Sequence, residues 1–364
     1  MASTATSTAT EAELKAEYTP LMHAIEDGKN EEALKLIADR ADVRDQESVR
    51  GLSPLMLAAG SGNLDVVSAL LLAGAPWNAL DRKGYCAGDH ALLNGHQEVV
   101  DVLVNAGVQA ELIFKALRGK SSLPPAKSSR PASGTDDAAA AAAATESEAD
   151  PYLRSEVRYE GDNLIDDRER GVMMEWEKPL MIAHAKELCA SGGDVLNVGF
   201  GLGLIDTAIA ELGPRSHTII EAHPQVYQRM LDLGFDKKPG VRIVFGRWQD
   251  VIYDIGTFDS VFFDTFSDVN DLDEFHDVLP IILRDGGLYS FFNGITPDSL
   301  FFQGVACQTI QISLAELGFT TEFEPVDLDV SEDEWQGISN RYFRSSTYYL
   351  PRIRKPRPGA ASAQ

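Results

Sequence analysis

The sequence predicts an α/β domain built on a mostly parallel sheet, preceded by an all-α domain of short repeats. Three observations lead to this prediction. Glycines recur at intervals of about 33 residues in the first third of the chain. From about residue 151, apolar strand segments alternate with helical segments. The apolar segment 195–198 ends in a turn that contains three glycines.

The repeats lie within residues 12–117. Thr19-Pro20-Leu21 recurs as Ser53-Pro54-Leu55, and Gly28, Gly62 and Gly95 each precede an apolar helical segment. A period of about 33 residues with a turn and two helices resembles ankyrin repeats, in which each unit buries its apolar face against the next. Separate helical hairpins that do not form such an array are the alternative interpretation.

The third repeat and the segment after it depart from the pattern. Asp89 and His90 follow Gly88 where Pro and Leu are expected, so the third unit is predicted to be degenerate. Residues 118–150 are rich in Pro, Ser and Ala and show no apolar periodicity. Because such a segment buries too little apolar surface to offset its ordering entropy, we expect a disordered linker.

The second domain is expected to span residues 151–356. Ligands on doubly wound sheets bind outside the carboxyl ends of the strands, so the site should lie where the strands end. The expected strands are 194–198, 217–221, 242–245, 260–264, 287–292, 319–324 and 347–352, and the expected helices are 174–190, 205–212, 224–233, 274–283 and 301–317.

Gly199, Gly201 and Gly203 form a G-x-G-x-G turn between a strand and a helix. Glycine is expected there because a ligand must approach the backbone. The dinucleotide fingerprint G-x-G-x-x-G would need its third glycine at Leu204, so a nicotinamide dinucleotide is disfavoured. A nucleoside ligand without a pyrophosphate fits better, and S-adenosylmethionine is the leading candidate.

Three further side chains follow strand ends. Glu221, about 20 residues beyond the glycine turn, is placed to accept the hydroxyls of a ribose, with a solvated strand end as the alternative. Trp248 is suited either to stack on an adenine ring or to pack in the core. Asp264 would place a carboxylate in the ligand cleft.

The composition constrains the partners. The formal net charge is -24 over 364 residues. It repels nucleic acid and anionic membranes and favours basic partners, although acidity also serves solubility alone. We therefore expect neither direct nucleic-acid binding nor a membrane partner. No metal is expected either, because no cluster of His, Cys or Asp has ligand spacing.

The sequence also bears on location. No apolar run approaches the roughly 20 residues of a membrane span, and the N-terminus lacks the pattern of a secretory signal. The three scattered cysteines fit a reducing compartment. The cytoplasm and the nucleus are therefore the expected locations.

Residues 172–181 (V-M-M-E-W-E-K-P-L-M), the V-G-F-G turn and the strand end Asp264-Thr265-Phe266 together resemble guanidinoacetate N-methyltransferase. With the repeats in front, the chain resembles the fungal type IV protein arginine methyltransferases over residues 19–107 and 155–352. This resemblance implies a Rossmann-like class I methyltransferase fold with a seven-stranded, mostly parallel sheet. It also implies methyl transfer from S-adenosylmethionine to the δ nitrogen of an arginine, with S-adenosylhomocysteine as the product.

The resemblance also assigns site residues. Glu177 and Asp264 would hold the guanidinium, which carboxylates bind in a fork geometry. Tyr159 would cap the cofactor, and Met181 would lie near it. The implied cofactor-binding residues are Tyr159, Met181, Gly199, Phe200, Gly201, Leu202, Gly203, Leu204, Ile205, Glu221, Ala222, His223, Arg247, Trp248 and Asp264.

Two segments depart from related enzymes. Asn197 stands where many methyltransferases have an acid, and Asn293-Gly294-Ile295-Thr296 differs from the small-molecule enzyme, which leaves the acceptor contacts there open.

The substrate is expected to be a protein. The resemblance implies a basic ribosomal protein, which the acidic repeats would dock. Methylation of a small guanidino metabolite and an inactive ankyrin-type interaction scaffold are the alternatives. The acidic residues of the repeats include Asp42, Asp45, Glu47, Asp65 and Asp81.

Overall fold

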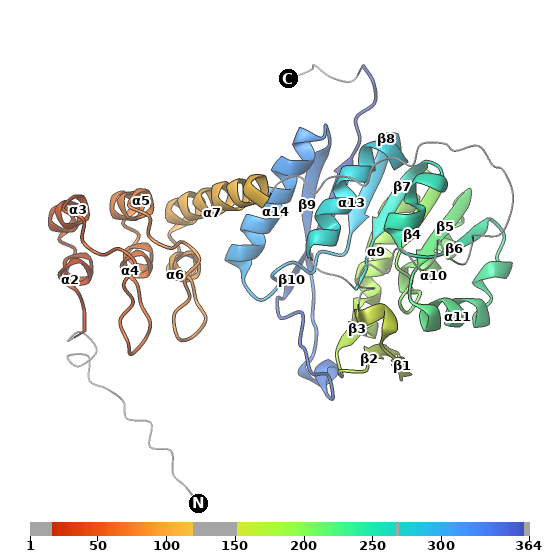
Figure 1. Ribbon diagram of the computed structural model, residues 1–364, viewed down its shortest axis with the longest axis horizontal. Coiled ribbons are helices and arrows are strands. Elements are labelled where there is room, and N and C mark those ends of the chain that lie inside the picture. The colour runs from red at the N-terminus through yellow and green to blue at the C-terminus, as the bar shows by residue number, and fades with distance from the viewer. Residues whose placement is uncertain (1–16, 119–150, 267–268, 360–364) are drawn as a thin grey trace, which may run out of the picture. The chain divides into compact units, whose positions relative to one another are not determined.

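The computed structural model describes residues 17–118, 151–266 and 269–359, and Figure 1 shows the elements. The chain divides into two compact units. The helical unit comprises Met1–Leu123 and Ser299–Thr309, and the α/β unit comprises Pro124–Asp298 and Ile310–Gln364. The expected linker lies outside the described residues, apart from its first position.

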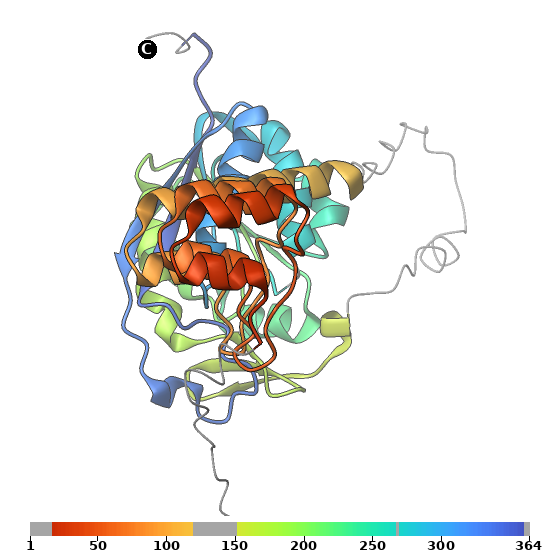
Figure 2. The same cartoon turned by 90° about the vertical axis from the view of Figure 1, so that its left-hand side faces the viewer.

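Within residues 17–118 of the helical unit, the structure has six helices that form three hairpins. They are α2 (Pro20–Glu26), α3 (Asn30–Ala38), α4 (Pro54–Gly60), α5 (Leu64–Leu72), α6 (Ala87–Leu93) and α7 (Gln97–Arg118). Helix α4 packs on both α2 and α6, and α5 packs on both α3 and α7, so the hairpins lie side by side (Figures 1 and 2). This confirms the predicted repeat array.

The first helix of each of the first two repeats begins at a capping hydroxyl. The side-chain oxygens of Thr19 and Ser53 accept the backbone N–H three residues later, at 3.3 and 3.2 Å. A proline follows each cap, which fits the first helical position because no N–H is needed there.

The third repeat begins differently from the prediction. Helix α6 starts at Ala87, so Ala87 and Gly88 occupy the Pro and Leu positions. The assignment of Asp89 and His90 to those positions was therefore wrong by two residues. Asp89 instead caps the helix, because its carboxylate accepts the N–H of Cys86 at 2.9 Å.

Packing within the helical unit explains why a glycine occupies position 88. This unit includes Ser299–Thr309, which takes in the first part of α14 (Leu300–Glu316). A Cβ at Gly88 would lie 2.0 Å from the ring of Phe301, so a leucine does not fit there. The Trp77 ring lies 6.2 Å from the Phe301 ring, measured between centroids.

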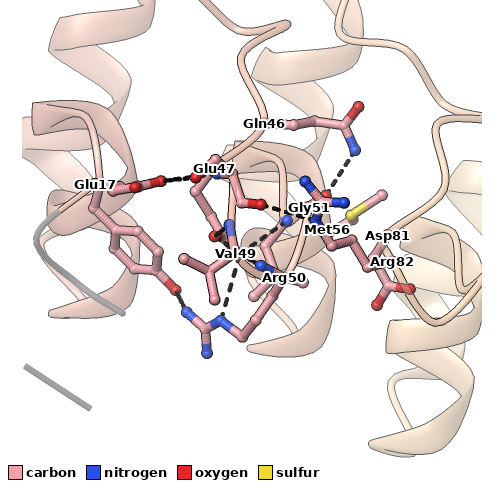
Figure 3. A network of polar contacts seen from close by, with 12 residues as sticks. Glu17, Gln46, Glu47, Val49, Arg50, Gly51, Met56, Asp81 and Arg82 are labelled. Atoms are coloured by element: carbon pink, nitrogen blue, oxygen red, sulfur yellow. Dashed lines mark hydrogen bonds and ion pairs between the residues drawn. The ribbon is translucent and has the colours of Figure 1, made fainter. Parts of the chain in front are cut away.

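The turns between the hairpins are hydrogen-bonded to one another (Figure 3). The backbone N–H of Arg82 donates to the carbonyl of Arg50 at 2.8 Å, and the side-chain amide of Gln46 donates to the carbonyl of Leu80 at 3.0 Å. The buried carboxylate of Glu47 accepts several backbone N–H groups of its own turn, at 2.7 to 3.2 Å. These bonds satisfy turn backbone groups and fix the spacing between repeats.

The described part of the α/β unit contains a seven-stranded sheet. Its strands are β4 (Asp194–Val198), β5 (Ser216–Glu221), β6 (Val241–Phe245), β7 (Phe258–Phe263), β8 (Leu283–Phe291), β9 (Thr320–Asp327) and β10 (Thr347–Arg354). Their order is β6-β5-β4-β7-β8-β10-β9. Strand β10 is antiparallel to both of its neighbours, and the other pairs are parallel. The predicted fold class is therefore confirmed.

Helices cover both faces of this sheet. They are α9 (Lys178–Cys189), α10 (Leu204–Leu212), α11 (Pro224–Asp232), α12 (Trp248–Val251), α13 (Val269–Ile282) and the second part of α14. Val195 of β4 packs in a buried cluster with α9, α10 and α11, whereas Leu196 and Val198 pack in another with α13 and α14. The chain runs from β4 toward one edge and returns to β7 on its other side, so the ligand site is expected at the end of β4.

A separate three-stranded antiparallel sheet was not predicted. It consists of β1 (Val157–Glu160), β2 (Asn163–Asp166) and β3 (Gly171–Met173), which are too short to show a clear alternation. The expected helix 174–190 is a 3-10 turn, η2 (Glu175–Glu177), followed by α9. Pro179 stands in the first turn of α9, where proline is tolerated. The other short turns are η1 (Pro151–Arg154), η3 (Phe235–Lys237), η4 (Ile252–Asp254) and η5 (Glu332–Trp335).

Candidate functional site

A cavity lies at the carboxyl ends of β4, β5, β6 and β7, at the edge of the sheet expected from the sequence. The empty space among its lining residues, open solvent included, amounts to about 730 Å³. The predicted residues that line it are Gly199, Gly201, Glu221, Ala222, Arg247, Trp248 and Asp264. The lining residues that were not predicted are Tyr152, Leu153, Val172, Met173, Val198, Ile220, Gly246, Gln249, Thr265, Phe266 and Asp271.

The other predicted cofactor residues lie outside this lining. Met181, Phe200 and Ile205 are buried in the core cluster of one sheet face. A ring nitrogen of His223 accepts the backbone N–H of Gln225 at 3.3 Å, so this side chain caps the start of α11. The residues placed outside the lining are Tyr159, Met181, Phe200, Leu202, Gly203, Leu204, Ile205 and His223.

Gly199 stands where the ends of β4 and β7 approach each other. Its φ is +96°, and a Cβ there would lie 1.8 Å from the carbonyl oxygen of Asp264. At Gly203, with φ at +74°, a Cβ would lie 2.4 Å from the ring of Phe200. Left-handed backbone and contacts within the protein therefore require glycine at both positions, in addition to any ligand approach.

Glu221 ends β5 and lines the cavity. Its two carboxylate oxygens accept the backbone N–H groups of Phe200 at 2.9 Å and of His223 at 2.6 Å. Burial raises the pKa of Glu221, while these N–H groups act in the opposite direction. The backbone N–H groups of Ala222 and Gly201 also lower the pKa of Glu221, so four backbone N–H groups surround this carboxylate at the cavity wall.

Aromatic side chains form part of the cavity wall. Trp248 lines it and packs edge-on against Phe275 at 5.1 Å between centroids, so the core-packing interpretation is confirmed and stacking on an adenine stays a prediction. The rings of Tyr152 and Phe266 lie 4.7 Å apart, and the Arg170 guanidinium lies 5.0 Å from the Phe266 ring. Tyr152 was missed because it directly follows the low-complexity segment. The D-T-F strand end was the only sequence feature that pointed to Phe266.

Asp264 follows the end of β7. Its Oδ2 atom is buried and has no hydrogen-bond partner among the described residues. Burial, and then the charge of Asp206, raise the pKa of Asp264. A cationic ligand that donates hydrogen bonds would stabilise the ionised form of this buried carboxylate.

Glu177 is the second carboxylate of the predicted pair. It is 2% exposed, at the junction of η2 and α9. Its Oε1 atom accepts the backbone N–H of Met174 at 2.8 Å and the hydroxyl of Tyr342. Burial, and then the negative charge of Asp264, raise the pKa of Glu177, so the two carboxylates interact electrostatically.

The acid that Asn197 lacks is supplied by α10. Asn197 is fully buried, and its amide donates to both carboxylate oxygens of Asp206 at 2.9 and 3.0 Å, as well as to the carbonyl of Gly199 at 2.8 Å. Nε2 of His217 lies 3.0 Å from Oδ1 of Asp206. A buried carboxylate thus stands behind the glycine turn, contributed by a helix.

Asn293 is hydrogen-bonded to the neighbouring strand β10. Its backbone N–H donates to the Tyr348 hydroxyl at 2.8 Å, and its amide donates to the carbonyl of Tyr349 at 2.9 Å. Asn293–Thr296 does not contribute to the cavity lining.

Two kinds of feature are absent from residues 17–118, 151–266 and 269–359, which the structure describes. No three side chains of His, Cys, Asp or Glu gather there as metal ligands. No helix there has both the length and the apolar character needed to cross a membrane.

The fold and the cavity define the class of protein. The strand order of the mostly parallel sheet changes direction at β4. A glycine turn follows β4 and Glu221 ends β5, as in α/β methyltransferases. Residues 148–293 match the family of guanidinoacetate N-methyltransferase, and residues 21–113 match ankyrin repeats in three copies. The chain is therefore an α/β methyltransferase-like protein with an ankyrin-repeat region.

Comparison with individual proteins narrows the class to a family. Similar proteins, each named Protein arginine N-methyltransferase 2, occur in several fungi. The one from Emericella nidulans is 33% identical over 373 residues, which cover 92% of this chain and 87% of the relative. Those from Candida glabrata and Saccharomyces cerevisiae are 30% and 32% identical, over 92% and 77% of their own lengths and 92% and 80% of this chain. The chain belongs to the protein arginine N-methyltransferase 2 family.

Proposed function

We propose that this protein transfers the methyl group of S-adenosylmethionine to a guanidinium nitrogen of an arginine in a protein substrate. The observation that supports this most is the cavity that joins the glycine turn and Glu221 to Asp264, whose buried Oδ2 has no partner among the described residues. Membership of the family supports arginine as the acceptor and a methyl donor as the cofactor.

The cavity residues fit the proposed cofactor. The Glu221 carboxylate at the cavity wall would accept the hydroxyls of a ribose, and Trp248 would offer an aromatic surface to an adenine. Gly199 and Gly201 leave the backbone accessible beside them. When bound, the cofactor supplies a methyl group on a sulfonium, from which a nitrogen lone pair can displace it while the carbon–sulfur electrons stay on sulfur.

Glu177 and Asp264 would hold the acceptor. A guanidinium is planar and presents paired N–H donors, so two carboxylates can fix its plane and align the attacking nitrogen. Their raised pKa values suit a proton acceptor, because the nitrogen must lose a proton once its bond to carbon forms. A carboxylate that takes this proton stays neutral in a buried site at little cost.

The finer assignments are also proposals. The δ nitrogen as the methylated atom and a ribosomal protein as the substrate follow from the resemblance described above. A location in the cytoplasm and the nucleus follows from the composition. Mass spectrometry of a methylated ribosomal substrate, with fragmentation that places the methyl group on the δ or a terminal nitrogen, tests the first two assignments. Microscopy of a fluorescent fusion tests the third.

The catalytic assignment is tested with Glu177→Gln and Asp264→Asn. Each should lower labelled-methyl transfer to arginine peptides by about 100-fold or more, because a charge-assisted contact to the guanidinium is lost. Glu175→Gln removes a nearby carboxylate that pairs with Lys178, and it should leave the rate unchanged. Unchanged activity in both site variants would contradict the assignment.

Two other outcomes identify the alternatives. Efficient methylation of free guanidino metabolites without methylation of protein would indicate a small-molecule enzyme. Calorimetry that detects no binding of S-adenosylmethionine would indicate an interaction scaffold.

Docking of the substrate by the repeats depends on the acidic side chains that are free to meet it. The side chains of Glu47 and Asp81 are only 0% and 5% exposed, whereas Asp42 and Asp65 are exposed and are the better candidates. Asp42 also accepts the backbone N–H of Arg44 at 2.9 Å. Changing both exposed residues to Asn in the full chain should raise KM for a basic protein and leave cofactor affinity unchanged. An unchanged KM would remove these two residues from the docking surface.

A further inference from the structure

The connection between β9 and β10, residues 328–346, packs beside the carboxylate pair. Its base is closed by the N–H of Leu328, which donates to the carbonyl of Ser346 at 2.9 Å. Trp335 and Phe343 of this connection are buried in one apolar cluster with Trp176, the residue that precedes Glu177. The connection is therefore packed against the segment that holds the carboxylate.

A second set of contacts fixes the connection to the turn between β2 and β3. The backbone N–H of Ser339 donates to the carbonyl of Glu169 at 2.7 Å, and its hydroxyl donates to the carbonyl of Arg168 at 2.8 Å. The N–H of Gly171 donates to the side-chain oxygen of Asn340 at 3.0 Å. Tyr342 lies two residues after Asn340, so the contacts of Ser339 and Asn340 also restrict its position.

Tyr342 reaches Glu177 through its hydroxyl. The phenol donates a hydrogen bond to Oε1 of Glu177, the same oxygen that accepts the N–H of Met174. The Tyr342 ring is held between tryptophans, at 5.8 Å from Trp176 and 5.1 Å from Trp335 between centroids. Both of these hydrogen bonds end on Oε1, and Glu177 itself lies outside the cavity lining, where it interacts electrostatically with Asp264.

We propose that Tyr342 is a positioning residue for methyl transfer, which fixes the Glu177 carboxylate so that Oε2 is presented to the guanidinium of the arginine. This inference rests on the proposed function and adds to it a residue that the sequence did not indicate. A carboxylate held by two donors on Oε1 cannot rotate about its last torsion without breaking both bonds. The acceptor therefore meets an oxygen whose direction is already set.

The protonation states agree with this role. Burial, and then the charge of Glu177, raise the pKa of the Tyr342 phenol well above its usual range, so it remains a donor. Its hydrogen bond lowers the pKa of Glu177, against burial and against the charge of Asp264. Asp206 acts on this pair indirectly, through Asp264. Removing the hydroxyl should therefore loosen the carboxylate and also favour its protonated form.

The test is Tyr342→Phe in the full-length protein, with Tyr289→Phe as the matched control. Tyr289 is a fully buried tyrosine of β8 whose hydroxyl has no hydrogen-bond partner among the described residues. For Tyr342→Phe, kcat/KM toward an arginine peptide should fall by about 10-fold to 100-fold at neutral pH. The rise of kcat/KM with pH should move to higher pH, because the pKa of Glu177 increases. Cofactor affinity and both properties of the control should stay unchanged.

A double variant keeps the test decisive if packing is also disturbed. Because Tyr342 acts through Glu177, adding Tyr342→Phe to Glu177→Gln should reduce kcat/KM no further. Additive losses, or a Tyr342→Phe enzyme with the wild-type rate and pH profile, would overturn the inference. Failure of the wild-type protein to methylate any arginine peptide is a different result, since it would overturn the proposed function itself.

Discussion

At the scale of single residues, buried charge is the main feature of the site. Asp264 lines the cavity, and the carboxyl groups of Glu177 and Asp206 interact with it electrostatically from outside the lining. The pKa values of Glu177 and Asp264 are raised. Buried like charges oppose folding unless a proton or a cation neutralises them. The same groups that suit a guanidinium therefore make the protein without its acceptor less stable at high pH.

This gives a prediction for stability against pH. The pKa of Glu177 in the folded protein lies above its ordinary value of 4.5. The protonated side chain therefore adds to the free energy of unfolding in full below pH 4.5, and this contribution is lost as the pH rises through the folded pKa. Thermal unfolding of Glu177→Gln should therefore show a gain over wild type at pH 8 that disappears at pH 4. The control Glu175→Gln should show no such trend, and equal melting temperatures for Glu177→Gln and wild type at pH 8 would contradict the prediction.

Asn197 gives a second prediction at this scale. Asn197→Asp would place a second buried carboxylate about 3 Å from the oxygens of Asp206, where the amide now donates. The free energy of unfolding should fall by about 3 kcal/mol or more, as measured by urea denaturation. Exchanging the two groups, in Asn197→Asp with Asp206→Asn, should recover most of the loss. No recovery would show that the direction of the hydrogen bond matters more than the charge.

At the scale of elements, the turns of the helical unit supply hydrogen bonds that stabilise the array in addition to the helix caps. The carboxylate of Glu47 is buried and accepts backbone N–H groups from its own turn, and the neighbouring turn is linked to it by backbone and side-chain bonds (Figure 3). A stacked array is stabilised through contacts between neighbours, so loss of one turn weakens the adjoining repeats.

Glu47→Ala should therefore lower the free energy of unfolding of the helical unit by about 1–3 kcal/mol, because buried N–H groups lose their acceptor. Denaturation followed by circular dichroism measures the change, since the described part of this unit is helical outside its turns. Glu111→Ala, on the exposed surface of α7, is the control and should have an effect close to zero. Equal effects of the two substitutions would show that the turn carboxylate is dispensable.

The success of prediction also differed among elements. The central strands could be predicted because they are apolar runs closed by Gly, Glu or Asp, and the repeats because their period is regular. Strands β1 to β3 could not, since three or four residues show no clear period. Asp264 and Glu177 were found from local motifs, whereas Tyr342 reaches Glu177 from 165 residues away along the chain. Only the folded topology brings such residues together.

At the scale of the whole molecule, the net charge of -24 acts over distances longer than any contact. An acidic protein attracts a basic substrate during encounter, and added salt screens this attraction over a Debye length of about 10 Å at 0.1 M.

Raising the ionic strength from about 50 to about 300 mM should therefore lower kcat/KM for a basic protein substrate by about 10-fold or more. The value for a short arginine peptide without other charges should change little. Steady-state methylation of both substrates over a salt series measures the difference. The same salt dependence for both would indicate that salt acts on the site and not on encounter.

The close approach of Gly199 to the carbonyl of Asp264 has a consequence for how this fold can diversify. The loop that would face the methyl donor and the strand end that would face the acceptor touch through their backbones, with no side chain between them to absorb a change. A substitution that moves the backbone at Gly199 also moves the backbone at Asp264. Changes of acceptor preference at these strand ends would therefore disturb binding of the methyl donor. New acceptors are accommodated at lower cost by segments outside the sheet, such as residues 328–346. The strand ends would then be inherited unchanged, while that connection varies at positions other than Tyr342 and the residues that hold it in place.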